Sequence, residues 1–552
     1  MNRILNVLLA TLMLSPIFAQ NLPISNAKSK PNRDEAAGLY ALWYQNTPNP
    51  ELYLNQPYVI GGQMVYQWKD LEPEKGKYDF SKMAQELDKY SKLKIYTTIQ
   101  INGNRKPDWL YNEVPCHPKK FSVQVSDKNG SIMYWHPTHK QAYANLLKAF
   151  AEFILNNKSG KYLVGIRQNF NGVGTEHLRI PEQNRDLKQW IVPEGADKSI
   201  TLQTYSDDIS DQYEIFVLDN YIKLFTNRVR VFVRNNISTK LEEKYKSKFE
   251  SGKLCWFHTS SEAEPHAPDV AINAADVEQQ YVRFYQYCRS GKTVGYAEPW
   301  ASAWGHHGPE IDDRWCSPPQ WFYWTQLNNL NCGVSYIGIY SMDMQVAIDG
   351  TYRNGKIDYK DGDNRNYKNE FTETLIFTNK YVGFHDKPAI SPGAWVAFRE
   401  NDTILAANGI PVEQRKLKVL TGDYNFLMER MPDKSYGHGI TNIGPDESRF
   451  GAWARVLPAN EQMNFRLNPV FVKTSKNKSV SIKVTYFDGK GKDFKIVINN
   501  TPYLVACKGQ NQWVTKVIEI KDRMLKTNDK KAQIAIQNGS ENIYLHMVEV
   551  TR

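Results

Sequence analysis

Cysteine is scarce in this sequence, and the few residues present lie far apart. They are Cys116, Cys255, Cys288, Cys316, Cys332 and Cys507. None of them forms a Cys-x-x-Cys pair, which argues against a structural zinc site and against a dithiol redox motif. One or two disulfides stay possible, with no pairing assignable. Cys255 and Cys288 fall in a predicted strand and a predicted helix, where we expect buried free thiols.

Long apolar runs are also missing, apart from one near the start. The run from Leu8 to Phe18 is shorter than the roughly 20 residues that cross a bilayer. Arg3 precedes it and the small residue Ala19 follows it, the pattern of a secretory signal peptide. We therefore expect residues 1–19 to be removed and the mature protein to be exported, to the periplasm, the cell surface or the medium. No cysteine follows closely enough for lipid attachment, and no membrane span is predicted.

Charge is not concentrated anywhere in the chain. The formal net charge is +10 and the pI is about 8.9, yet the basic residues are spread along the sequence. A nucleic-acid-binding protein needs a basic stripe, so we expect no nucleic-acid partner. An exported basic protein more readily meets an acidic polymer or an uncharged one. The 14 Trp and 32 Tyr residues could supply stacking platforms for sugars, although ordinary packing accounts for most of them.

What the sequence does contain is a regular alternation of strand-like and helical segments. Strand-like runs occupy Leu39 to Tyr44, Val59 to Val65, Lys94 to Ile101, Leu163 to Asn169, Val229 to Arg234, Leu254 to Thr259, Thr293 to Ala297 and Val334 to Ser341. Helical periodicity marks Ser81 to Tyr90, His139 to Leu155, Asp211 to Asn227, Ala275 to Arg289, Pro318 to Leu330 and Glu370 to Tyr381. Eight strand-helix units predict an α/β fold, a (β/α)8 TIM barrel over residues 20–387.

A different pattern begins near Pro388. Strand-like runs follow one another, separated by Gly, Asn, Asp and Lys turns, and no convincing helix intervenes. They are Ala394 to Phe398, Tyr424 to Glu429, Gly451 to Val456, Val480 to Tyr486, Phe494 to Ile498, Val514 to Ile520 and Ile543 to Val550. This pattern predicts an antiparallel β-sandwich over residues 388–552, either one domain or two with a break near Asn468-Pro469. We expect it to support the barrel by packing, with a sugar platform of Trp395, Trp453 and Trp513 as the alternative.

Two glutamates occupy the places that matter most in a parallel barrel. Glu176 follows the fourth predicted strand and Glu298 follows the seventh, and the residues after the strand ends build the active site of this fold. A retaining glycosidase needs one carboxyl group to protonate the leaving oxygen and a second, about 5–5.5 Å away, to attack the anomeric carbon. Glu262 and Glu264, after the sixth strand, are the rivals of Glu298.

The segment after the second strand resembles a known family. Trp68 to Phe80 resembles the W-x-x-L-E-P-x-x-G-x-Y-D-F segment of clan-A glycoside hydrolases, notably β-galactosidase-like ones, and Lys106 to Leu110 resembles their P-x-W-L turn. The resemblance implies that Glu176 is the acid/base and Glu298 the nucleophile. Two positions depart from the clan's pattern: Thr175 stands where Asn precedes the acid/base, and Tyr340 stands where a Trp ends the eighth strand.

Other polar and aromatic residues at the strand ends are candidates for binding the substrate. They are Trp68, Gln100, Asn102, Arg105, Asn169, Asn171, His177, Arg234, Asn235, His258, Trp300, Trp304, His306, His307 and Tyr340. Asn169 or Asn171 would bind the sugar 2-hydroxyl in place of the missing Asn. Trp300 and Trp304 could stack on sugar rings. We assign no metal to the adjacent histidines His306 and His307, and no cofactor to the protein.

These observations predict an exported retaining glycoside hydrolase that uses two Glu residues. For its substrate the β-galactosidase-like segment and the basic charge favour a β-linked galactan, in polymer or oligosaccharide form, such as agar, porphyran or carrageenan. Arg105, Arg167, Arg234 or the histidine pair would contact sulfate groups. The alternative is a carbohydrate-binding or scaffold protein of a glycan-utilisation system, whose barrel has lost activity.

Overall fold

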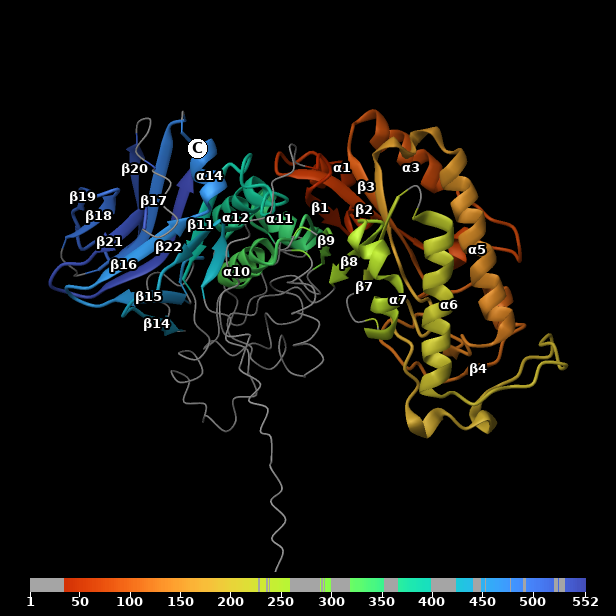
Figure 1. Ribbon diagram of the computed structural model, residues 1–552. Helices are drawn as coiled ribbons and strands as arrows, with labels where there is room; N and C mark the ends of the chain where they lie inside the picture. Colours follow the sequence, from red (N-terminus) through yellow and green to blue (C-terminus); the bar gives the residue numbers. More distant parts are fainter. Residues whose placement is uncertain are drawn as a thin grey trace, which may run out of the picture.

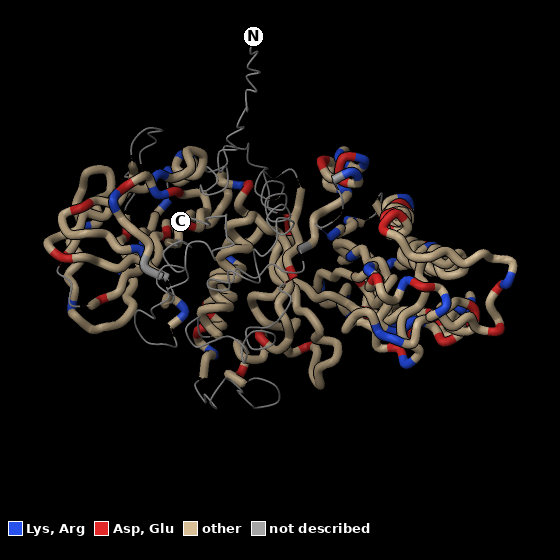
Figure 2. Tube along the Cα trace, turned by 90° about the horizontal axis from the view of Figure 1, so that it is seen from below, with Lys and Arg blue, Asp and Glu red and all other residues tan. Residues whose placement is uncertain are grey.

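The computed structural model describes residues 34–226, 229–234, 237, 239–258, 288, 291, 293–298, 318–351, 366–398, 423–439, 448–451, 453–476, 478–489, 493–520, 525 and 532–552. A barrel and a sandwich lie side by side, with helices between them (Figure 1). In the described part of the chain, no helix is long and apolar enough to cross a membrane. Lysine and arginine are interspersed with aspartate and glutamate along both parts (Figure 2).

Eight parallel strands close into a barrel, which confirms the predicted fold class. They are β1 (Gly38–Leu42), β2 (Val59–Gln67), β3 (Tyr96–Asn102), β6 (Leu163–Arg167), β7 (Arg230–Arg234), β8 (Leu254–His258), β9 (Gly295–Ala297) and β10 (Tyr336–Tyr340). Their order around the barrel is β1-β10-β9-β8-β7-β6-β3-β2. Each coincides within a few residues with a run predicted from β-branched and aromatic composition. β1 closes the ring by pairing with both β10 and β2.

Helices cover the outside of the barrel. The longer ones are α3 (Ser81–Lys92), α5 (Pro137–Asn156), α6 (Asp207–Phe225), α7 (Thr239–Glu250), α10 (Pro318–Asn331), α11 (Ser341–Asp349) and α12 (Lys368–Tyr381), and the short ones are α1 (Pro50–Leu54), α2 (Trp68–Leu71) and α4 (Asp108–Tyr111). In α5 the buried residues recur every three or four positions, from Tyr143 to Ile154, so one face packs on the strands. The sequence did not predict α7 or α11. Nearly all of the predicted helix at 275–289 falls outside the described residues.

Aromatic side chains fill the interior of the barrel. Tyr40, Phe232, Phe257, Tyr296 and Tyr336 form a buried cluster. Rings from non-adjacent strands meet across it: the centroids of Tyr40 and Tyr296 are 6.2 Å apart, and those of Phe232 and Tyr336 are 5.4 Å apart. Filling by bulky residues makes the barrel a packed core and leaves the strand ends as the place for a site.

The C-terminal region is a sandwich of two antiparallel sheets. The larger sheet holds β11 (Gly393–Ala397), β12 (Tyr424–Phe426), β14 (Tyr436–Gly439), β15 (Trp453–Leu457), β17 (Val480–Asp488), β20 (Gln512–Ile520) and β22 (Ile543–Thr551). The smaller holds β13 (Met428–Arg430), β16 (Gln462–Leu467), β18 (Phe494–Ile498), β19 (Thr501–Val505) and β21 (Ile534–Gln537). Strands from both sides of Asn468 take part in each sheet, so the described strands form one sandwich.

Two details of the sandwich correct the sequence analysis. The run from Tyr424 to Glu429 is not one strand: Leu427 has a positive φ of 55°, and the chain crosses there from the larger to the smaller sheet. A helix, α14 (Pro469–Thr474), occurs where none was expected. Pro469 stands in its first turn, and the side chain of Asn468 accepts hydrogen bonds from two of its backbone N–H groups. Those are standard helix-start signals.

Helices α10 and α12 join the barrel to the sandwich (Figure 1). The Tyr323 hydroxyl lies 2.9 Å from His546 Nε2, and Lys380 Nζ lies 2.8 Å from Glu549 Oε1. Trp395 is fully buried and stacks on Phe426, so it is not part of a surface platform. The sandwich thus supports the barrel through packed, hydrogen-bonded contacts. Cys255 and Cys288 are buried and free, as expected.

Candidate functional site

Glu176 is presented by a short hairpin that follows β6. The backbone N–H of Asn171 donates to Thr175 O, and that of Val173 donates to His177 O. Gly174 stands at the turn with φ 68°, a conformation that favours glycine because it has no Cβ. The hairpin turns the chain back toward the barrel, so that the carboxyl group of Glu176 lies over the ends of the strands with 10% of its side chain exposed.

Glu298 reaches the same place directly from β9. Side chains two residues apart on a strand face the same side, so Glu298 lies above Tyr296 of the aromatic cluster. By the same rule Arg234 lies above Phe232. Arg167 lies above Gly165, where a Cβ would stand 2.4 Å from the Phe232 ring. The two-residue repeat therefore stacks a charged layer on the aromatic layer inside the barrel.

Arg167 holds the two glutamates together. Its Nη1 lies 2.9 Å from Glu298 Oε2, and its Nη2 contacts Glu176 Oε1. Nη1 also donates to Gln100 Oε1 at 2.6 Å, and the guanidinium carbon lies 4.1 Å from the Phe257 ring centroid. Because both carboxyl groups contact one rigid guanidinium fork, they lie close together at the strand ends and form one site. The side chain of Arg167 is 3% exposed.

Each glutamate has further hydrogen-bond donors. Arg234 Nη1 donates to Glu176 Oε2 at 2.9 Å, and Gln124 Nε2 donates to the same oxygen at 3.3 Å. Gln63 Nε2 lies 3.4 Å from Glu298 Oε2 and 3.3 Å from the Tyr296 hydroxyl. Sequence reasoning missed Gln63 and Gln124. A polar residue in the buried strand β2 was a usable signal for Gln63, but nothing in the local sequence marks Gln124.

The charged side chains at this site are buried, and each lies close to a group of opposite charge. Burial lowers the pKa of Arg167, and the attraction of Glu298 opposes this shift. Burial likewise lowers the pKa of Arg234 to about 10. The pKa of His177 is lowered by burial and by the positive charge of Arg234. Among the described residues, two guanidinium groups therefore lie beside two carboxyl groups of opposite charge.

Several predicted substrate-binding residues do lie at the site formed by Arg167 and the two glutamates. Gln100 and Arg234 contact the central ions, as described above. Tyr340, at the end of β10, lies near enough to Arg167 to influence its pKa. His177 belongs to the hairpin of Glu176, and its Nδ1 atom lies 2.6 Å from the Ser122 hydroxyl.

Other predicted residues are turned away from the pocket. Trp68 is fully buried, donates to Glu72 Oε2 at 2.8 Å and packs on Tyr143 of α5, so it is a core residue and not a sugar platform. Asn169 and Asn171 both donate to Ile101 O, at 2.9 and 3.1 Å. Both residues have no exposed surface, so in this arrangement neither presents a surface to a sugar hydroxyl.

Two more candidates are engaged elsewhere. Asn102 is buried and its Oδ1 accepts from Asn169 at 3.3 Å. Arg105 is half-exposed and pairs with Asp70 at 3.1 Å. The remaining candidates, which are Asn235, Trp300, Trp304, His306, His307 and the side chain of His258, lie outside the described residues, as do the rival glutamates Glu262 and Glu264.

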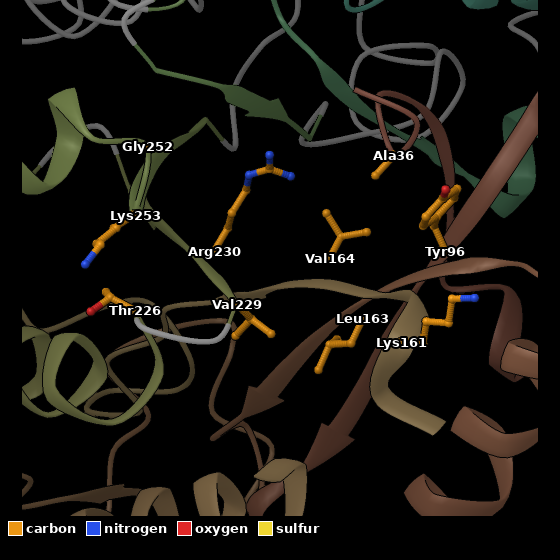
Figure 3. Close-up of a pocket in the computed structure, with 10 residues that line it drawn as sticks. All are labelled: Ala36, Tyr96, Lys161, Leu163, Val164, Thr226, Val229, Arg230, Gly252 and Lys253. Carbon is orange, nitrogen blue, oxygen red and sulfur yellow. The ribbon is translucent and has the colours of Figure 1, made fainter. Parts of the chain in front are cut away.

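Two cavities lie at the opposite end of the barrel. One, of about 370 Å³, is lined by residues at or before the starts of strands, including Tyr96, Leu163, Arg230 and Lys253 (Figure 3). The other, of about 300 Å³, adjoins it at Arg230. In TIM barrels this end serves stability and the strand ends serve chemistry. Among the described residues, no group of His, Cys, Asp and Glu side chains is arranged to hold a metal ion.

The fold and the paired glutamates indicate a class of protein. A closed parallel barrel with paired glutamates at its strand ends is the architecture of (β/α)8 glycoside hydrolases, and the comparison with known families supports this class. Residues 63–165 match the family described as beta-galactosidase. The chain is a glycoside hydrolase that resembles the β-galactosidases of clan A, as its sequence motifs predicted. A search of the curated proteins found no match.

The match covers only part of the barrel. It runs from Gln63 in β2 to Gly165 in β6 and therefore includes neither Glu176 nor Glu298. The roles of these two residues rest on their geometry.

Proposed function

We propose that the protein is an exported retaining glycoside hydrolase that cleaves β-linked galactosides. The observation that carries the proposal is the convergence of the buried side chains of Glu176 and Glu298 on Arg167 at the strand ends. Contact with a common guanidinium favours the short separation that a retaining pair requires, about 5–5.5 Å, over the wider gap that leaves room for a water in inverting enzymes.

Glu298 is the nucleophile in this proposal. Arg167 and Gln63 donate to its Oε2, which orients the carboxylate. Its oxygen attacks the anomeric carbon as the bond to the leaving oxygen breaks, and a covalent glycosyl ester forms. Water then attacks the same carbon and releases the sugar and the free carboxylate.

Glu176 is the acid and then the base. It donates a proton to the leaving oxygen in the first step and takes one from water in the second. The guanidinium groups of Arg167 and Arg234 contact its carboxyl group, and positive charge so near favours the ionised form. The entering sugar must therefore break the contact between Glu176 and Arg167 before Glu176 can protonate the leaving oxygen.

The pairing of the described arginines indicates what charge the substrate can carry. Arg167 and Arg234 are committed to the glutamates, and Arg105 pairs with Asp70. These residues support a galactose unit that is uncharged at the point of cleavage. For a sulfated galactan, the sulfate would have to sit away from the bond that breaks. Matched sulfated and desulfated polymers, compared by the oligosaccharides released, test that part of the proposal.

The main test uses Glu176→Gln and Glu298→Gln, with Glu182→Gln, an exposed residue, as the matched control. On methyl β-D-galactopyranoside or a galactan that the protein degrades, each of the first two should lose about 1,000-fold or more in kcat/KM, while Glu182→Gln keeps it. The newly released sugar should be the β-anomer by NMR. Normal turnover by folded Glu298→Gln would refute the proposal, and binding of glycans without new reducing ends in the wild type would favour the carbohydrate-binding alternative.

A further inference from the structure

We propose that Gln124 is a positioning residue for Glu176; this inference rests on the proposed role of Glu176 as acid/base. One side-chain amide holds both the backbone and the carboxyl group of that residue. Gln124 Oε1 accepts from the N–H of Thr175 at 3.1 Å and from the N–H of Glu176 at 2.9 Å. Its Nε2 donates to Glu176 Oε2 at 3.3 Å.

Glu176 needs such a residue because it lies on a loop, whereas Glu298 directly follows a strand. Glu298 comes directly after a barrel strand, whose pairing fixes its direction. Glu176 lies several residues beyond β6, on a hairpin, and sites on loops are less exactly held than sites on strands. A side chain from a neighbouring segment can hold Glu176 in position, because hydrogen bonds to the backbone of the hairpin restrict the motion of the hairpin.

The segment that carries Gln124 is itself anchored. It belongs to the connection between β4 (Cys116–His117) and β5 (Ser131–Ile132). Asp127, close by, is buried and accepts from the N–H of Lys106 at 3.0 Å and from the Tyr111 hydroxyl at 2.6 Å. The N–H of Ser126 donates to Asn104 O at 2.9 Å. Gln124 therefore acts from a fixed point.

The two segments are also in close contact. A Cβ built at Gly174 would stand 2.5 Å from the Cβ of Gln124 and 3.0 Å from its backbone. Only glycine permits this approach, and it brings the amide of Gln124 to the N–H groups of the next two residues. Glycine at 174 thus serves both the turn and the contact with Gln124.

The amide suits both steps of the acid/base cycle. Being neutral, it leaves the charge of the pocket unchanged. Its N–H can donate to Glu176 Oε2 when the carboxyl group is ionised, and it leaves Oε1 to carry the proton. We infer that Gln124 keeps one oxygen of Glu176 occupied and so directs the other toward the leaving oxygen.

The test is Gln124→Glu, which keeps the shape and the backbone acceptor but replaces the donor by a charged oxygen. For methyl β-D-galactopyranoside, whose departure needs a proton, kcat/KM should fall by about 10–100-fold. The alkaline limb of its pH profile should move upward by about one unit, because a second carboxylate disfavours ionisation of the first. Dinitrophenyl β-D-galactopyranoside, whose leaving group needs no proton, should be cleaved with little change in the first step.

The matched control is Gln141→Glu on the exposed face of α5, which makes the same chemical change away from the pocket. Gln141→Glu should change neither substrate's turnover nor the pH profile. A Gln124→Glu enzyme with an unmoved pH profile and equal losses on both substrates, or with no loss, would overturn the inference and leave the proposed function standing. If the wild type cleaves no galactoside, a crystal structure of Gln124→Leu decides: the inference requires the Glu176 carboxyl group to shift, and an unchanged position refutes it.

Discussion

The two ends of the barrel interior carry similar ions in different arrangements. At the strand starts, one Arg meets one Asp: Arg230 pairs with Asp34 at 2.9 Å, and the Tyr336 hydroxyl donates to Asp34 at 2.7 Å. At the strand ends, Arg167 is shared between two glutamates, and its buried Nε has no partner within the described part of the chain, nor does Gln63 Oε1. Buried polar groups are normally paired. The ions at the strand starts have partners of opposite charge, whereas polar atoms at the strand ends are left over that a ligand could pair with.

The largest expected effect is on kcat/KM, which should fall when the arginine at the strand ends is replaced and hold when the arginine at the strand starts is replaced. Arg167→Met leaves both glutamates without their common cation, and we expect kcat/KM to fall about 100-fold or more, since displacing a catalytic group by about 1 Å can cost about 100-fold in rate. Arg230→Met, the matched change at the strand starts, should reduce the free energy of unfolding but keep kcat/KM within about threefold. Steady-state kinetics on galactosides and urea titrations measure the two effects.

The comparison would fail if Arg230→Met lost turnover as completely as Arg167→Met while circular dichroism showed it to be folded. It would also fail if both variants kept full activity.

The barrel could be predicted because its signal is repeated along the chain. Each strand is a short run rich in β-branched and aromatic residues, and eight of them alternate with helical periodicity. Errors arose where the signal was local or mixed. The run at Tyr424 looked like one strand, since nothing in its composition marks the positive φ of Leu427. Helix α14 was missed although Asn468 and Pro469 carry start signals, because it has only six residues.

The site could be predicted only where it follows the strands. Glu176 and Glu298 were found from their place after strand ends, and Arg234 likewise. Trp68 was misassigned because it also follows a strand, yet the chain turns there into α2 and buries the indole. Gln124 could not be found, since its contact with Glu176 joins two loops that are distant in sequence, and no pattern of period two or 3.6 relates them.

A second difference between the ends should appear as a dependence of stability on pH. Lys106 lies beneath the Glu176 hairpin, where its Nζ donates to Gly103 O at 2.7 Å, and burial lowers its pKa to about 8 although Asp127 opposes the shift. Between that value and the ordinary pKa of 10.5, the unfolded chain binds more protons than the folded one. The free energy of unfolding should therefore rise with pH across this range, by about 3 kcal/mol in total.

Urea unfolding of Lys106→Met at pH 7 and pH 10, beside the wild type and the exposed control Lys82→Met, measures this contribution. The rise should be present in the wild type and in Lys82→Met and absent from Lys106→Met. Equal slopes in all three proteins would show that Lys106 is protonated as freely in the folded state as in the unfolded one.

The ions at the strand starts should give a smaller effect of the same sign, but in the acidic range. Burial would raise the pKa of Asp34, but Arg230, the Tyr336 hydroxyl and the N–H of Ala36 together hold it below its ordinary value of 3.8. A carboxyl group with a lowered pKa stabilises the fold above its unfolded pKa and loses that contribution as the pH falls through the folded one. Asp34→Asn should therefore cost about 2 kcal/mol at pH 7 and progressively less below pH 4, where the wild type loses the same ion pair. A cost that stays constant down to pH 2 would mean that the pair contributes nothing through its charge, and the difference between the two ends would then be one of packing alone.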